Sequence, residues 1–225
     1  MVVVVLLDYW PTSIGHRQRG VDSNCMLPWE HAAVAYLLYS GYSRLRYGEP
    51  PNGWAVLVVL FASQLPDLMD KPLAWEFGLV PSGRTVGHSI FVGVPLSGIV
   101  LLVARQYGHP QLGVSFGIGY LSHLATDAVP LYPGSSTSFE SILWPVRTYE
   151  EPSDPDDGFV EITFEILTQG LSLFTAAPRT NALVAVVLVG LMGIVWLIDG
   201  LPGLRETATI LVWPFAKLRT AMAFK

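Results

Sequence analysis

Six residues of the kinds that bind metal ions fall at the ends of apolar segments that we expect to be helices. They are His31, Asp67, Asp70, His88, His123 and Asp127. Imidazole and carboxylate groups are costly to place beside hydrocarbon, so a group of them in an apolar chain predicts a functional site. Three histidines with three carboxylates also match the ligands of zinc and manganese in proteins. We therefore expect a divalent metal ion, zinc or manganese, as the cofactor.

The spacing of these residues supports a shared site. His123 and Asp127 are four residues apart, which places them on one face of a helix. Asp67 and Asp70 are three apart and directly follow Pro66. Asp127 lies near the expected end of its helix, where a carboxylate is unfavourable unless a cation is close. These spacings favour a metal site over unrelated surface residues.

The composition is that of a membrane protein. Of 225 residues, 51% are hydrophobic and 14% are charged, whereas soluble domains carry about 25% charged residues. The mean hydropathy is +0.44. The net charge of −5 argues against nucleic acid as a partner. We predict an all-α fold: a polytopic membrane helix bundle of about six helices.

Apolar runs and turn residues give the bounds of these helices. Helices are expected over residues 28–46, 54–67, 85–107, 111–128, 159–176 and 181–198, and an amphipathic tail over 207–224. The run 182–197 is uncharged and reads as the clearest span, although it is slightly shorter than the ~20 residues that a crossing needs. Two segments, 68–84 and the acidic 132–158, read as irregular.

The chain is predicted to form one membrane domain after a short arm. Residues 1–25 form an arm or a wrongly assigned start, and we expect them to be dispensable. Residues 26–225 form the domain, with an irregular acidic loop at 132–158 and additional helices at 159–225.

Tracing the chain back and forth brings all six polar residues to one end of the bundle. Short connections make neighbouring helices antiparallel, so each helix that leaves His31 or His88 is followed by one that returns. Basic residues gather in the connections at the opposite end, and basic loops tend to be cytoplasmic. We therefore expect a protein of the cell membrane whose site faces outward.

Four short pieces carry a family resemblance. They are Trp29-Glu30-His31-Ala32, Leu65-Pro66-Asp67-Leu68-Met69-Asp70, Arg84-Thr85-Val86-Gly87-His88-Ser89 and His123-Leu124-Ala125-Thr126-Asp127. In this order and spacing, over about residues 28–145, the chain resembles the membrane-bound metal-dependent hydrolase-like family. That family includes LexA-regulated inner-membrane proteins of bacteria and many archaeal versions, and we expect an archaeal member. Where the family commonly has a histidine before the arginine of the third piece, this chain has Gly83.

The resemblance implies membrane location and a metal-dependent hydrolase. We expect His31, Asp67, His88, His123 and Asp127 to be metal ligands, and Asp70 to be either a further ligand or the general base. Arg84 is expected to hold an anionic group of the substrate, because its guanidinium is a bidentate donor. A bound ion would activate water and polarise a phosphoryl oxygen.

The expected partners are membrane lipid and an anionic lipid or phosphoester substrate met at the membrane interface. Two non-catalytic interpretations remain open. One is a structural metal site that holds the helices of the bundle together. The other is an ion or proton pathway, since intramembrane histidine and aspartate residues also form proton relays.

Overall fold

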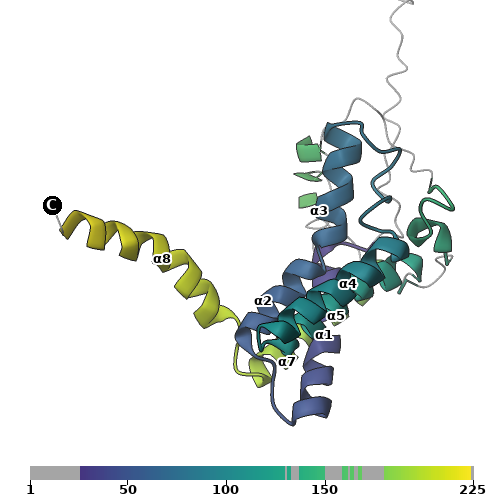
Figure 1. The fold of residues 1–225 in the computed structure, drawn as a ribbon. Helices are drawn as coiled ribbons and strands as arrows, with labels where there is room; N and C mark the ends of the chain where they lie inside the picture. Colours follow the sequence, from purple (N-terminus) through teal and green to yellow (C-terminus); the bar gives the residue numbers. More distant parts are fainter. Residues whose placement is uncertain are drawn as a thin grey trace, which may run out of the picture.

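In the described part of the chain, all regular secondary structure is helical (Figure 1). The computed structural model describes residues 26–129, 131–132, 137–149, 159–161, 163–164, 167–168 and 180–223. Within these ranges there are seven α-helices and no strand, which confirms the all-α class. They are α1 (Pro28–Tyr47), α2 (Gly53–Ala62), α3 (Leu65–Lys71), α4 (Ile90–Gln106), α5 (Pro110–Ala128), α7 (Thr180–Ile198) and α8 (Leu204–Ala223), with short turns η1 (Pro72–Glu76) and η2 (Phe139–Ile142). The arm at 1–25 and most of the helix expected at 159–176 lie outside the described residues.

Helix α1 begins and ends where its residues predict. Pro28 lies in the first turn, where a missing backbone N–H costs nothing, and Glu30 follows at the positive end of the helix dipole. Arg44 lies in the last turn, and Gly48 ends the helix with φ of 74°, a left-handed conformation that glycine adopts without strain. The expected helices at 111–128 and 181–198 also appear, as α5 and α7.

Helix α5 is the centre of the bundle. It packs against α1, α2 and α4, and Figure 1 shows α4 and α5 side by side. The backbones of α5 and α2 approach very closely at Gly119. A Cβ atom there would lie 2.4 Å from the carbonyl oxygen of Val59, so a larger residue would push the helices apart. This close packing buries most of α5, including its last two turns.

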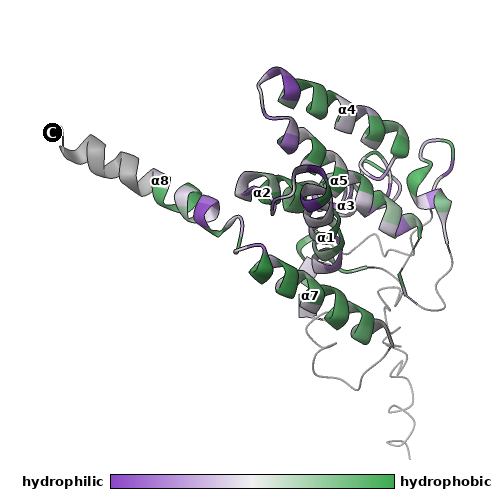
Figure 2. Ribbon diagram, turned by 90° about the horizontal axis from the view of Figure 1, so that it is seen from below, coloured by the Kyte–Doolittle hydropathy of each residue, from purple (hydrophilic) through white to green (hydrophobic). Residues whose placement is uncertain are grey.

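The outer helices are apolar on their exposed faces. Figure 2 shows long hydrophobic stretches in α4 and α7, and α4 exposes Phe91, Ile99 and Leu102. Among the described residues, one helical run is long and apolar enough to cross a membrane, Gly53–Glu76. The runs Ile90–Gln106 and Ala182–Ile198 are apolar but shorter. The segment 182–197, expected to be the clearest span, lies within α7 and belongs to these shorter apolar runs.

Two sequence-based boundaries near the candidate site are also wrong. The helix expected to end at Asp67 is followed by a second helix, α3, which contains both Asp67 and Asp70. Pro66 lies at its first turn, so the proline starts a helix and does not begin a loop. The helix expected from residue 85 begins at Ile90, and His88 precedes it. The segment before α4 instead forms a turn around the Asp70 carboxylate.

A buried aspartate joins α7 to α1 at the end of the bundle away from His31. Asp199 follows α7 and accepts hydrogen bonds from the hydroxyls of Tyr36 (2.6 Å) and Ser40 (2.7 Å). It also forms an ion pair with Arg44. The three partners lie on successive turns of α1, so this network fixes the end of α7 to α1.

Candidate metal centre

Five of the six predicted site residues converge in one buried volume. His31 comes from the first turn of α1, Asp67 from α3, and His88 from the turn before α4. His123 and Asp127 come from the last turns of α5. The antiparallel trace expected from the sequence brings these elements to the same end of the bundle.

The Nε2 atom of His88 is surrounded by potential ligand atoms. It lies 3.2 Å from Nε2 of His123, 3.4 Å from Oδ1 of Asp67 and 3.4 Å from Oδ2 of Asp127. The His88 and His123 side chains are fully buried. Two imidazoles and two carboxylates from three separate elements thus face one another.

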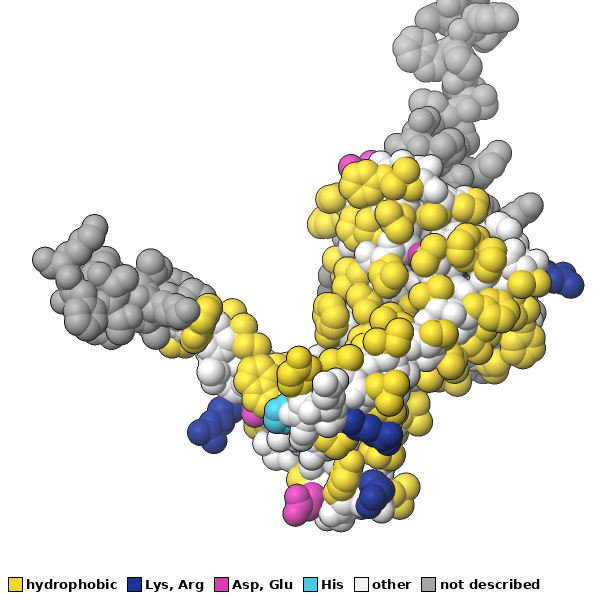
Figure 3. All heavy atoms as spheres, viewed as in Figure 1, with side chains coloured by type: hydrophobic (Ala, Val, Ile, Leu, Met, Phe, Trp, Pro, Cys, Tyr) yellow, Lys and Arg dark blue, Asp and Glu magenta, His cyan; other side chains and the backbone are white. Residues whose placement is uncertain are grey.

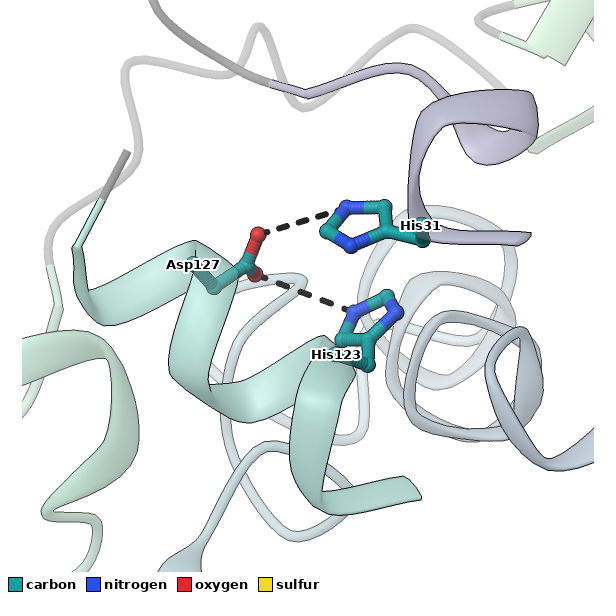
Figure 4. A group of neighbouring side chains, drawn as sticks. All are labelled: His31, His123 and Asp127. Atoms are coloured by element: carbon teal, nitrogen blue, oxygen red, sulfur yellow. Dashed lines mark ion pairs between the residues drawn. The ribbon is translucent and has the colours of Figure 1, made fainter. Parts of the chain in front are cut away.

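His31 completes the cluster from the side of α1. Its Nε2 atom lies 3.5 Å from Oδ1 of Asp127, and its ring stacks on His123 with centroids 3.9 Å apart. Figure 4 shows the Asp127 carboxylate between the two rings, with one oxygen directed to each. Asp127 therefore touches all three histidines.

Hydrogen bonds at the Nδ1 atoms orient the three histidine rings, so that each Nε2 atom faces the cluster. Nδ1 of His123 donates to the carbonyl oxygen of Ser63 (2.6 Å), and Nδ1 of His88 to the carboxylate of Asp70 (2.9 Å). Nδ1 of His31 lies 2.9 Å from the hydroxyl of Thr126, which itself donates to backbone carbonyls. With a proton on Nδ1, the Nε2 atom of each ring faces the cluster, where it can bind a metal ion once it carries no proton. Histidines that bind metal ions are held in this way.

Parts of the donor set have spacings that fit a divalent ion. Ligand distances of ~2.0–2.2 Å place neighbouring ligand atoms roughly 3 to 3.5 Å apart, and the separations here run from 3.2 to 3.8 Å. Two overlapping groups could hold an ion: His31 with His123 and Asp127, and Asp67 with His88 and His123. Both groups use His123, whose one available nitrogen can serve only one ion.

Asp70 lies beside the cluster and not in it. Its carboxylate accepts backbone N–H bonds from Thr85 (2.7 Å), Gly87 (2.8 Å) and His88 (3.0 Å), besides the bond from Nδ1 of His88. The sequence offered Asp70 as ligand or general base. In the structure both of its oxygens are occupied by these donors, and the side chain is fully buried.

The turn that carries His88 is held on two further sides. Gly87 packs against α3 so closely that a Cβ atom would lie 2.8 Å from the carbonyl oxygen of Pro66. Its own carbonyl accepts a hydrogen bond from Tyr120 of α5 at 2.6 Å. Burial lowers the pKa of His88, but hydrogen bonds with Asp127, Asp67 and Asp70 outweigh it and raise the pKa to about 10. The three carboxylates thus stabilise a proton on the His88 ring, which a metal ion at Nε2 would have to displace.

Two basic side chains flank the carboxylates of the cluster. Nζ of Lys71 lies 2.7 Å from Oδ2 of Asp67, and Nε of Arg84 lies 3.3 Å from Oδ2 of Asp127. Both cations lie against aromatic rings, Lys71 on Trp75 and Arg84 on Tyr149. Sequence reasoning identified Arg84 but missed Lys71, although its position four residues after Asp67 on a helix could have indicated the pair.

Fold and site together define an all-helical protein with a buried histidine–aspartate centre at one end of its bundle. The chain matches the family described as YdjM inner membrane protein over residues 26–202, and it belongs to that family. Comparison with curated proteins and with solved structures gave no match. The family supports an inner-membrane protein, whereas hydrolase activity, archaeal origin and the outward orientation stay predictions.

Proposed function

We propose that this protein is a membrane-bound metal-dependent hydrolase that acts on a phosphoester at the membrane interface. The observation that carries the proposal is the convergence of three Nε2 atoms with the carboxylates of Asp67 and Asp127. Without a metal ion, Lys71, Arg84 and a proton on His88 balance the carboxylates of the cluster, and a divalent ion among these five donors would take the place of that proton. Zinc or manganese at this point would lower the pKa of a bound water and polarise a phosphoryl oxygen.

The residues of the chain take distinct roles in this proposal. His31, His88, His123, Asp67 and Asp127 hold the ion. Asp70 orients His88 through the Nδ1 hydrogen bond, and because its oxygens already accept four N–H donors it is poorly suited to take a proton from water. Arg84 balances Asp127 and meets an anionic group of the substrate.

A structural metal site is the second candidate, and the number of donors favours it. Five protein ligands exceed the four of a closed zinc site, so an ion bound by all five at once would have little room for water. A hydrolase requires that at least one position stay open to solvent or substrate. The Asp67 side chain, which is 15% exposed while those of His88 and His123 are fully buried, is where such a position could open.

The two candidates are separated by assaying purified protein for metal-dependent release of phosphate or headgroup from phosphoesters and phospholipids. The hydrolase proposal predicts turnover that a chelator abolishes and added zinc or manganese restores. His88→Ala should lose this turnover, and His109→Ala, a change at an exposed histidine of the opposite end, should keep it. Tightly bound metal without turnover on any phosphoester would contradict the hydrolase and support the structural site.

A further inference from the structure

The side chains of the cluster that are most exposed to solvent are its two flanking cations and Asp67. The side chains of Lys71, Arg84 and Asp67 are 22%, 15% and 15% exposed, whereas those of the histidines and Asp127 are between 0% and 4% exposed. Lys71 and Arg84 bind carboxylates that both lie 3.4 Å from the same nitrogen of His88. A group that approaches the centre from solvent therefore meets two positive charges first.

These charges favour an anionic ligand. With neutral histidines, the carboxylates of Asp67, Asp70 and Asp127 are opposed by Lys71, Arg84 and a divalent ion, so the loaded site carries an excess of one positive charge. Two buried donors in the segments that carry these cations also lack a hydrogen-bond partner among the described residues: Nε1 of Trp75 and the hydroxyl of Thr85. Trp75 lies against Lys71, and Thr85 adjoins Arg84. A phosphate offers several acceptor oxygens for such donors.

Exposed apolar side chains occur in the same segments as the site residues. Leu68 follows Asp67 and is 51% exposed, and Leu131 comes shortly after the end of α5. The others are Phe77 (65%), Leu79 (71%) and Val146 (72%). We call these five side chains the apolar rim. Figure 3 shows hydrophobic side chains gathered over the end of the molecule that carries α3.

The apolar rim differs from the apolar faces of α4 and α7. Those faces belong to long regular helices, for which contact with membrane hydrocarbon is expected. Leu68 lies on the short helix α3, within the run Gly53–Glu76, whereas Phe77, Leu79 and Val146 lie in irregular segments. The segment of Val146 is tied there by a hydrogen bond from Ser89 to the carbonyl of Trp144 and by the contact of Tyr149 with Arg84. An apolar edge around a cationic entrance is complementary to an amphiphile.

We propose that the site receives the phosphate of a lipid headgroup between Lys71 and Arg84 while the apolar rim holds the acyl part of the same lipid. The inference deepens the proposed function and rests on it for the presence of the ion. The membrane family of the chain makes such a lipid available at the interface. A lipid headgroup and a free phosphoester both offer an anionic phosphate. The two ligands are distinguished by how much the acyl chains of the lipid add to its binding affinity.

The test is direct binding to metal-loaded full-length protein, measured by calorimetry with three probes. These are a short-chain phosphatidylglycerol below its micelle concentration, the corresponding phosphodiester without acyl chains, and the corresponding short-chain diacylglycerol without phosphate. We expect the complete lipid to bind about tenfold or more tightly than either part. Equal affinity for the complete lipid and the chainless phosphodiester would overturn the inference.

Variants test which residues bind the phosphate and which bind the acyl chains of the lipid. The double change Phe77→Ser with Leu79→Asn should remove the advantage of the chained over the chainless probe and leave metal content unchanged. Lys71→Gln should weaken both phosphate-containing probes about tenfold. Leu45→Asn, a change at a 91% exposed leucine near the far end of α1, is the matched control and should bind like wild type. If the rim variant keeps wild-type lipid affinity but dissociates an oligomer, a second copy of the chain covers the rim and the inference is wrong.

Failure of the inference and failure of the proposed function give different results. Lipid that binds as described but is never hydrolysed contradicts the hydrolase and leaves the lipid site standing. If chainless phosphodiesters are bound as tightly as lipids and hydrolysed as fast, the result supports the hydrolase and contradicts the lipid site.

Discussion

Asp70 and His88 are joined by a 2.9 Å hydrogen bond between Oδ2 and Nδ1, and this bond turns the other nitrogen of His88 into the cluster. The same carboxylate accepts three backbone N–H groups from the turn that carries His88. One buried aspartate therefore sets the path of the backbone and the direction of a ring. In the proposed metal site, Asp70 would therefore position His88 as a ligand.

Asp70→Asn should weaken metal binding without removing it. The amide keeps the size of the carboxylate, but it loses one acceptor oxygen and the negative charge that holds the proton on Nδ1 of His88. Loss of such a supporting group typically lowers metal affinity about 10- to 100-fold. Competitive titration with a chromophoric chelator measures the change. A lower saturating stoichiometry with unchanged affinity would contradict the positioning role.

Gly87→Ala should destabilise the turn and weaken metal binding together. The new Cβ atom would lie 2.8 Å from the Pro66 carbonyl oxygen and 3.1 Å from Cβ of Met69. We expect a loss of roughly 1 to 3 kcal/mol in the free energy of unfolding, measured by denaturation in detergent. The matched control is Gly98→Ala in α4, where nothing lies within 4 Å of the new atom. This control should be neutral or stabilise the helix by up to ~1 kcal/mol. A Gly87 variant as stable as the control would show that the turn can move away from α3.

Arg84→Lys distinguishes a substrate contact from a structural partner. Lysine keeps the charge but loses the planar fork that binds carboxylate and phosphate with two hydrogen bonds. If Arg84 holds the substrate, KM should rise about tenfold or more while metal content stays at the wild-type level. If it only balances Asp127, metal content or stability should fall instead. Wild-type values for KM, metal content and stability would exclude both roles.

Asp199→Ala should destabilise the bundle while leaving the metal centre intact. The change removes the acceptor for Tyr36 and Ser40 and the partner of Arg44. Because Arg44 is 44% exposed, its charge can be hydrated, so the expected cost is only ~1 to 3 kcal/mol. Thermal unfolding measures the loss, and metal analysis serves as the control. Lost metal at unchanged stability would mean that the two ends of the bundle are coupled.

The sequence predicted the helices and the grouping of site residues better than it predicted their local structure. The i,i+4 spacing of His123 and Asp127 and the strong start of α1 follow from local rules, and both appear as expected. The turn before α4 could not be predicted in the same way. Its conformation depends on Asp70, which lies far enough back in the chain that no local pattern links the two. Periodicity alone extended that helix to residue 85, because the competing hydrogen bonds are tertiary.

The same limit explains what was missed around the centre. In the sequence, nothing distinguishes Asp70 from the other acidic residues of the predicted site. Only the four N–H donors around its carboxylate show that it lies beside the cluster. Ser63 and Thr126, which orient His123 and His31, are ordinary helix residues in the sequence. Asp199 carries no local signal at all, because its partners lie on α1. Roles that depend on long-range hydrogen bonds become visible only in the structure.

The central claim is that the cluster holds one divalent ion, and metal analysis combined with X-ray absorption at the metal edge tests it most directly. Wild-type protein should contain about one zinc or manganese ion per chain, with four to six nitrogen and oxygen ligands at ~2.0–2.2 Å and a clear imidazole signal. The double variant His123→Ala with Asp127→Ala should lose the ion, and His109→Ala should keep it. A wild-type protein that stays metal-free after equilibration with zinc and manganese, or a double variant with the same stoichiometry and spectrum as wild type, would contradict the account.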